Sequence, residues 1–361
     1  MVSVAGHAYP WDVLDDPDFP ARVRRAGLDT VVLAASYHST RAATPLHPAR
    51  RTVDARHAAL YRPIRAGVWA GHRLRPLAPA WMPAPDPFGD AAKVLRRNGF
   101  RVVAWLVLAH DTRLGAAHPD VTVVNCFGER YPYALCPAQP EVRTYLATLA
   151  AEAVRDAPVD AVSLESCGQM GVDHPGHHEK TAGAWNAHSR RVLSICCCGF
   201  CRADWRRAGA DDNEVIEGLR AERIDDVVLP TRQANTDALR AKVLAAVRGE
   251  HPAAPITLHA APDPWATGPS PGLTPTAADD VDALMVPAWP LDSASLVAAA
   301  AAYGKPVGAY LTVLSEASAA DLVRHARALV GAGASRLNLY HLGLAPAWRQ
   351  PLFADIVAAV R

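Results

Sequence analysis

Residues 159–167, VDAVSLESC, show the pattern that recurs along this chain: a short apolar run that ends in polar residues. A strand of a parallel sheet that helices cover on both faces has this pattern. Similar runs occupy residues 2–9, 30–36, 101–108, 255–260, 283–287, 306–312 and 336–340, with helical stretches between most of them. Eight such steps predict a (β/α)8 TIM barrel, folded as a single domain over residues 1–361. The alternative is an open doubly wound sheet, which usually carries a Gly-rich phosphate loop after its first strand, and GHAYP at residues 6–10 is not such a loop.

Two long interruptions of the barrel are expected. Residues 37–87 form a proline-rich, irregular excursion after the second strand, with a possible hairpin arm over residues 64–69. Residues 166–205 form a His- and Cys-rich, metal-binding insertion after the fourth strand. Residues 202–248 are then expected to be helical, with an interruption around Pro230.

The composition limits the kinds of partner. The 361 residues include 37 Lys+Arg and 36 Asp+Glu, a formal net charge of +1. Because no block carries one sign of charge, we expect neither a nucleic-acid nor a membrane-surface partner. The chain has no apolar run of ~18 residues and no basic lead before its first strand, so we expect no membrane span and no signal peptide. Nothing in the sequence indicates an oligomeric state.

The cysteines indicate a cellular compartment. Four of the seven lie within residues 196–201. This clustering suits metal binding in a reducing compartment better than a secreted disulfide framework. We therefore expect a cytoplasmic protein.

The chemistry of a barrel lies where its strands end. The predicted ends are rich in histidines and aromatic residues: His7, Tyr9, Tyr37, His38, His110, Asp111, Glu165, His259, Asp263, Trp289, Tyr310, Tyr340 and His341. A sugar-like ligand needs such a set, because its apolar ring faces stack on aromatic rings and its hydroxyls bind polar groups. The simpler interpretation is that several of these rings only close the top of the barrel.

Glu165 is the most specific of these candidates. It ends an apolar strand, so burial is expected to raise its pKa and to retain a proton near neutral pH for general acid catalysis. The alternative is a carboxylate that pairs with an arginine or caps the next helix.

The loop that follows contains His174, His177, His178 and Glu179. These residues can contact substrate hydroxyls, relay a proton or bind a metal. Their spacing is not His-Glu-x-x-His, so a zincin-type helix is excluded. A solvated polar loop is the alternative.

The run CCCGFC at residues 196–201 places Cys196, Cys198 and Cys201 at metal-ligand spacing. A structural Zn²⁺ needs a fourth ligand to complete a tetrahedron, and Cys136, Cys167 and Cys126 are candidates. We favour Cys136, which precedes the helix before the fourth strand, because a closed metal site at Cys167 would intrude on Glu165. Unligated buried thiols are the alternative.

A strand that ends in Glu165 and is followed by Cys-x-Cys-x-x-Cys resembles the zinc-carrying β-galactosidases and related glycoside-hydrolase-like (β/α)8 barrels. CPAQPEVR at residues 136–143 and LYHLGL at residues 339–344 are similar to members of this group without an assigned substrate. The resemblance implies that Glu165 is the general acid/base and that three cysteines plus one upstream bind zinc. It also implies a nucleophilic carboxylate at the end of the seventh strand, where this chain has AYLTV at residues 309–313. The nearest carboxylate there is Glu316, and Asp263 and Asp111 are the other options.

These observations predict a glycosidase that acts on a small carbohydrate-like substrate. Glu165 would protonate the leaving oxygen, with Glu316, Asp263 or Asp111 as nucleophile or base. The residues expected to line the sugar site are His7, Tyr37, His38, His110, Asp111, His177, His178, His259, Trp289, Tyr310, Tyr340 and His341. Two alternatives remain: a sugar-binding barrel that does not hydrolyse, and a metal-dependent hydrolase that uses the His174–Glu179 loop.

Overall fold

A computed structural model describes residues 2–174, 179–181 and 183–361. In this part of the chain eight parallel strands close into a barrel in the order β1-β13-β12-β11-β10-β9-β6-β2, and β2 pairs again with β1. The strands are β1 (Ser3–Ala8), β2 (Thr30–Tyr37), β6 (Arg101–Val107), β9 (Ala161–Glu165), β10 (Ile256–His259), β11 (Ala283–Pro287), β12 (Val307–Thr312) and β13 (Ala334–Tyr340). The predicted (β/α)8 barrel is therefore confirmed, and closure excludes the open sheet.

Helices follow most strands along the chain. They are α1 (Pro10–Val13), α2 (Phe19–Arg25), α3 (Pro87–Arg97), α4 (Thr112–Ala117), α5 (Pro140–Val154), α6 (Ala187–Leu193), α7 (Gly199–Arg207), α8 (Asp212–Arg220), α9 (Val228–Glu250), α10 (Ala277–Asp280), α11 (Ala294–Ala301), α12 (Ala319–Gly331) and α13 (Gln350–Val360), with short 3-10 turns at Pro119–Val121 and Ala347–Arg349. Several helices begin at a side-chain cap. The Asp86 carboxylate accepts from Gly89 N at 2.9 Å, and the Ser318 hydroxyl accepts from Asp321 N at 3.1 Å.

Burial explains why the strands are apolar runs. In β10 and β12 every residue is buried, since the barrel interior covers one face and helices cover the other. One contiguous cluster of buried hydrophobic residues extends from Val4 to Val357. None of the helices in the described residues is long and apolar enough to cross a membrane.

The excursion after β2 contains small strands of its own. β3 (Thr40–Ala43) and β4 (Thr52–Ala55) form an antiparallel hairpin, and β5 (Ala59–Leu60) pairs antiparallel with β2. The expected hairpin arm over residues 64–69 is wrong, because that segment consists of turns and irregular backbone. The hairpin lies earlier, where Ala42, Val53 and Ala55 alternate with exposed residues and bury one face.

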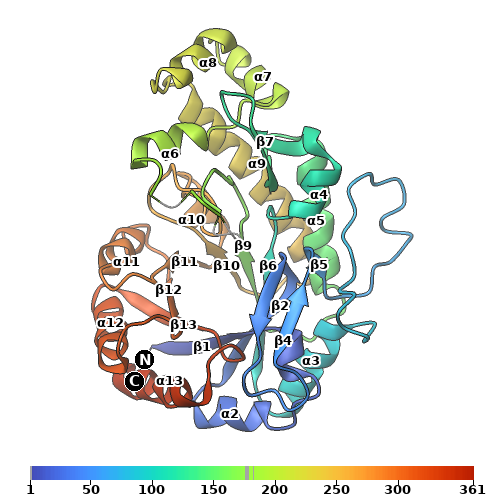
Figure 1. The fold of residues 1–361 in the computed structure, drawn as a ribbon, viewed down its shortest axis with the longest axis vertical. Coiled ribbons are helices and arrows are strands. Elements are labelled where there is room, and N and C mark those ends of the chain that lie inside the picture. Colours follow the sequence, from blue (N-terminus) through green and yellow to red (C-terminus); the bar gives the residue numbers. More distant parts are fainter. Residues whose placement is uncertain (1, 175–178, 182) are drawn as a thin grey trace.

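A second hairpin precedes α5, where β7 (Thr122–Val124) pairs antiparallel with β8 (Arg130–Leu135). Figure 1 shows α6, α7 and α8 at the end of the molecule opposite α2 and α13, so the segment after β9 extends the barrel at one end. The interruption expected around Pro230 lies slightly earlier, at residues 221–227, and a second break occurs at residues 208–211. Pro230 lies in the first turn of α9, where its missing N–H is not needed.

Candidate functional site

The carboxyl ends of the barrel strands bring a ring of aromatic and imidazole side chains together. The His7 ring contacts Trp105 and Tyr310, both with centroids 4.6 Å away. Tyr37 contacts Trp105 at 4.8 Å, and Tyr310 contacts Tyr340 at 5.8 Å. These contacts connect β1, β2, β6, β12 and β13, so the mouth of the barrel is lined by rings. Trp105 was not among the sequence candidates, because it lies two residues before the end of its strand.

Further predicted ligand-binding residues lie at the edge of this ring. Tyr9 contacts His341 at 4.2 Å, and its hydroxyl lies 3.2 Å from the Tyr340 hydroxyl. Trp289 is 44% exposed, although its ring lies 5.2 Å from Tyr340 and 6.0 Å from Tyr310. Trp289 therefore presents an apolar face to solvent next to the buried rings, as a platform for a sugar requires.

Glu165 lies inside the ring and is 5% exposed. Its Oε2 accepts a hydrogen bond of 2.8 Å from Trp105 Nε1. Burial raises the pKa of Glu165 to about 7, and the Trp105 hydrogen bond opposes this shift because it stabilises the carboxylate. Within the described residues, no arginine or lysine forms an ion pair with Glu165, so a substantial fraction of this carboxyl holds a proton near neutral pH.

His259 is the second polar neighbour of Glu165. Its Nδ1 lies 3.7 Å from Glu165 Oε2, and its Nε2 lies 2.9 Å from the Ser163 hydroxyl. Burial lowers the pKa of His259 to about 3, so the two groups do not form an ion pair at neutral pH. If Ser163 donates to Nε2, Nδ1 carries the hydrogen toward Glu165.

Asp12 is a buried carboxyl that the strand-end analysis missed, because it follows β1 by four residues. Its Oδ2 accepts from Tyr9 N at 2.8 Å and lies 3.7 Å from His341 Nδ1, while its buried Oδ1 has no hydrogen-bond partner among the described residues. Burial raises the pKa of Asp12 to about 7. Burial raises the pKa of Tyr340, and the charges of Glu165 and Asp12 add to this shift, so Tyr340 lies within electrostatic reach of each carboxyl.

A second cluster lies at the outer edge of β2 and β6. The His38 ring stacks on Tyr37 at 4.2 Å and on His110 at 4.4 Å. His110 Nε2 lies 2.9 Å from His174 Nε2, so one of these nitrogens donates to the other. Burial lowers the pKa of His38 to about 4 and lowers that of His110 well below its usual value. His177 and His178 lie outside the described residues.

The other carboxylate candidates have separate contacts. Asp111 is 7% exposed and caps α4 by accepting from Leu114 N, and burial raises its pKa to about 6. Asp263 is exposed and lies 3.4 Å from the guanidinium of Arg191. Glu316 is exposed near Trp348 and α12. Within the described residues, no hydrogen bond or ion pair joins these three carboxylates to Glu165.

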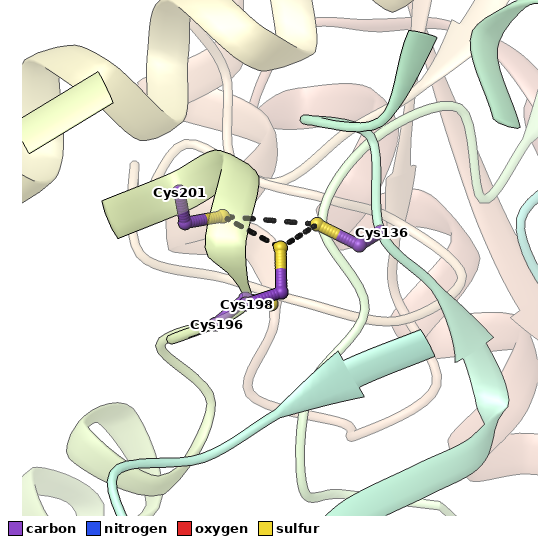
Figure 2. Close-up of side chains that lie close together, drawn as sticks. All are labelled: Cys136, Cys196, Cys198 and Cys201. Atoms are coloured by element: carbon purple, nitrogen blue, oxygen red, sulfur yellow. Dashed lines mark hydrogen bonds between the residues drawn. The ribbon is translucent and has the colours of Figure 1, made fainter. Parts of the chain in front are cut away.

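The structure also brings together the predicted metal ligands. Cys136 follows β8, and Cys196, Cys198 and Cys201 lie at the start of α7 (Figure 2). The Sγ atoms of Cys136, Cys198 and Cys201 are 3.7 to 3.8 Å apart, and all four Sγ atoms lie within 4.8 Å of one another. A zinc tetrahedron with Zn–S bonds of ~2.3 Å has S···S edges of ~3.8 Å, whereas a disulfide needs ~2.05 Å. The thiol cluster is therefore spaced to hold a metal ion.

Positive charge lies beside the thiol cluster. Arg232 is 7% exposed, and its Nη1 donates to Ser194 O at 3.0 Å. Burial lowers the pKa of Arg232, and negative charge on Cys201, Cys196 and Cys136 opposes this shift. Burial also lowers the pKa of Arg143, and negative charge on Asp204, Cys136 and Cys201 opposes this shift. Four thiolates around a divalent ion carry a net charge of −2, which two guanidinium groups offset.

Comparisons with known proteins support the fold. The α-L-fucosidase isoenzyme 2 from Paenibacillus thiaminolyticus matches with a TM-score of 0.62 and 12% identity over 100% of this chain and 49% of its own. The glycoside hydrolase domain of PgaB (BpsB) from Bordetella bronchiseptica matches with a TM-score of 0.61 and 18% identity over 99% of both chains. Gan42B, a GH42 β-galactosidase from G. stearothermophilus, matches with a TM-score of 0.59 and 13% identity over 100% of this chain and 56% of its own.

The chain thus has a (β/α)8 barrel of the kind that these glycoside hydrolases have. It spans about half the length of the fucosidase and of the β-galactosidase. No protein-family model matches the sequence, and no curated protein matches it.

Proposed function

We propose that this protein is a glycoside hydrolase in which Glu165 is the general acid. The observation that carries the proposal is a carboxyl with a pKa of about 7, buried at the end of β9 inside a ring of aromatic side chains. Such a group can donate a proton to a leaving oxygen while the rings bind the sugar. The barrel that the chain shares with several glycoside hydrolases supports the same class of reaction.

Turnover of a panel of aryl glycosides tests this proposal. We expect at least one neutral glycoside to be hydrolysed, and we expect Glu165→Gln to lower kcat/KM by roughly 10²–10⁴-fold, the usual contribution of a general acid. Circular dichroism and thermal unfolding of the variant show that the fold is retained. Turnover that survives Glu165→Gln, or no turnover of any glycoside, would contradict the proposal.

The partner carboxylate is assigned by the same assay. Glu316, Asp263 and Asp111 remain our candidates for nucleophile or base, and Asp12 joins them because its buried carboxyl lies 3.7 Å from His341, a residue expected to line the sugar site. The candidates are compared as Glu316→Ala, Asp263→Ala, Asp111→Ala and Asp12→Ala, because truncation leaves room for an added anion. A nucleophile variant is expected to recover turnover with azide, because the anion replaces the lost carboxylate at the sugar carbon, and the other variants do not recover.

A second candidate function is a sugar-binding barrel without hydrolysis. β12 ends in a tyrosine, a leucine and a threonine rather than a carboxylate, and Tyr310 occupies the ring. Calorimetry distinguishes the two functions. Oligosaccharide binding that leaves the sugar intact after prolonged incubation favours the second candidate, whereas product formation favours hydrolysis.

We also propose that the thiol cluster holds a structural zinc ion. Four thiolates suit Zn²⁺ and leave no open coordination position for catalysis. In the described residues, the thiol cluster is the group spaced to hold a metal.

A further inference from the structure

A groove lies beside the barrel mouth, next to the carboxyl ends of β2 and β6. It has a volume of about 620 Å³ and is lined by the β3–β4 hairpin on one side and by residues that follow β6, β9 and β10 on the other. The lining includes His38, Arg41, Asp54, Arg56, His110 and His174. Volumes of ~300–1,000 Å³ are typical of ligand sites.

The groove is connected to the acid by side chains in contact. His38 lines the groove and stacks on Tyr37 at 4.2 Å, and Tyr37 contacts Trp105 at 4.8 Å. Trp105 donates to Glu165 at 2.8 Å. The wall of the groove therefore lies two side chains from Glu165, with the buried rings of Tyr37 and Trp105 between His38 and the carboxyl.

The charges in the groove indicate the chemistry of its ligand. The lining contains Arg41 and Arg56 together with Asp54 and Asp173. Arg56 Nε lies 3.1 Å from Asp54 Oδ2, and Asp173 Oδ2 lies 3.5 Å from Arg190 Nη1. His38 and His110 are neutral at physiological pH, since burial lowers the pKa of both. A strongly charged ligand would find no net opposite charge here, whereas carboxylates, guanidinium groups and neutral imidazoles all bind hydroxyls.

We propose that this groove binds the further sugar units of an oligosaccharide, so that the natural substrate is a chain of neutral sugars rather than a simple glycoside. The proposal rests on the proposed glycosidase function and names its substrate class. The groove positions the chain, and Glu165 protonates the bond at its end.

A length series tests the proposal. The aryl monoglycoside that the panel identifies is compared with aryl di-, tri- and tetrasaccharides of the same sugar. We expect kcat/KM to rise at least tenfold from the monoglycoside to the tetrasaccharide. We expect the double variant Arg41→Ala/Arg56→Ala to lower kcat/KM tenfold more for the tetrasaccharide than for the monoglycoside. Thr52→Ala is the matched control, because Thr52 is exposed on β4 but does not line the groove.

Each outcome decides between the proposals. Monoglycoside turnover that depends on Glu165 but does not change with chain length would overturn the groove proposal and leave the proposed function intact. No turnover of any member of the series would overturn both. Calorimetry on proteins that carry Glu165→Gln gives an independent readout. Tetrasaccharide binding that weakens at least tenfold when Arg41→Ala/Arg56→Ala is added supports the groove. Equal binding with and without these two substitutions contradicts it.

Discussion

At the scale of single residues, the hydrogen bond from Trp105 determines how strongly acidic Glu165 is. Burial raises the pKa of Glu165, while the Trp105 N–H lowers it because it binds the ionised form. The Nε1–Oε2 distance of 2.8 Å is that of a full hydrogen bond to a charged acceptor. A variant that lacks only the Trp105 N–H therefore separates the effect of burial on the pKa of Glu165 from the effect of the hydrogen bond.

We predict that Trp105→Phe raises the pKa of Glu165 further. A hydrogen bond to a charged group contributes ~1.5 kcal/mol or more, which corresponds to roughly one pH unit. The alkaline limb of the kcat/KM–pH profile reports the loss of the acidic proton, and it is expected to move upward by about that amount.

Trp69→Phe is the control for the loss of a buried indole. Trp69 is 1% exposed, and its Nε1 has no hydrogen-bond partner among the described residues. We expect this variant to keep the wild-type profile. An unshifted limb in Trp105→Phe, or an equal shift in both variants, would show that the Trp105 hydrogen bond does not determine the acidity of Glu165.

At the scale of elements, the thiol cluster connects the segment before α5 to the start of α7. Cys136 follows β8, while the other thiols precede or open α7 (Figure 2). Cys136 lies 60 or more positions before the other three thiols in the sequence. A metal bound at this point would fix α7 and α8, which extend from the barrel at one end (Figure 1).

We predict that Cys198→Ser removes the metal and destabilises the protein by roughly 3 kcal/mol or more, because the remaining buried thiols lose their shared ion. Elemental analysis is expected to give about one zinc per wild-type chain and almost none per variant chain. Limited proteolysis is expected to cut the variant between α6 and α8 first, since these helices depend on the metal.

Cys126→Ser is the matched control, because Cys126 is 2% exposed but does not belong to the thiol cluster. It is expected to keep its zinc and its resistance to proteolysis. Zinc retained in Cys198→Ser, or lost equally in both variants, would reject the four-thiol site.

At the scale of the whole molecule, buried titratable groups determine how stability depends on pH. Burial lowers the pKa of His7, His38, His110, His259 and His341. Burial raises the pKa of Glu165, Asp12 and Asp111. The stability contributed by neutral histidines is lost as pH falls through their unfolded pKa of ~6.5, whereas the buried carboxyls oppose this loss because they bind protons in the folded state.

We predict that the free energy of unfolding falls between about pH 6 and pH 5. In this window the unfolded chain holds protons on five imidazoles and the folded chain on three carboxyls, a net difference of about two protons. This corresponds to roughly 2–3 kcal/mol per pH unit. Urea unfolding at several pH values measures the slope, and residues 1–361 are expected to unfold in one transition.

Glu165→Gln provides the internal check on this slope. The variant lacks one carboxyl that binds a proton in the folded state, so its stability is expected to fall more steeply toward pH 5 than that of the wild type. An identical slope in the two proteins would show that Glu165 does not retain its proton in the folded state.

The sequence by itself determined the barrel, because strands buried on two faces must be apolar and such runs are visible without coordinates. It also determined that a carboxyl ends the fourth barrel strand and that Cys196, Cys198 and Cys201 lie close together, since local spacing carries both, whereas Cys136 was one of three candidates for the fourth thiol. Only the tertiary structure decided which residues surround Glu165. Strand register brings Trp105 to the mouth, and the helical turn after β1 brings Asp12 there. No local pattern in the sequence records which distant side chains the register and the turn bring into contact.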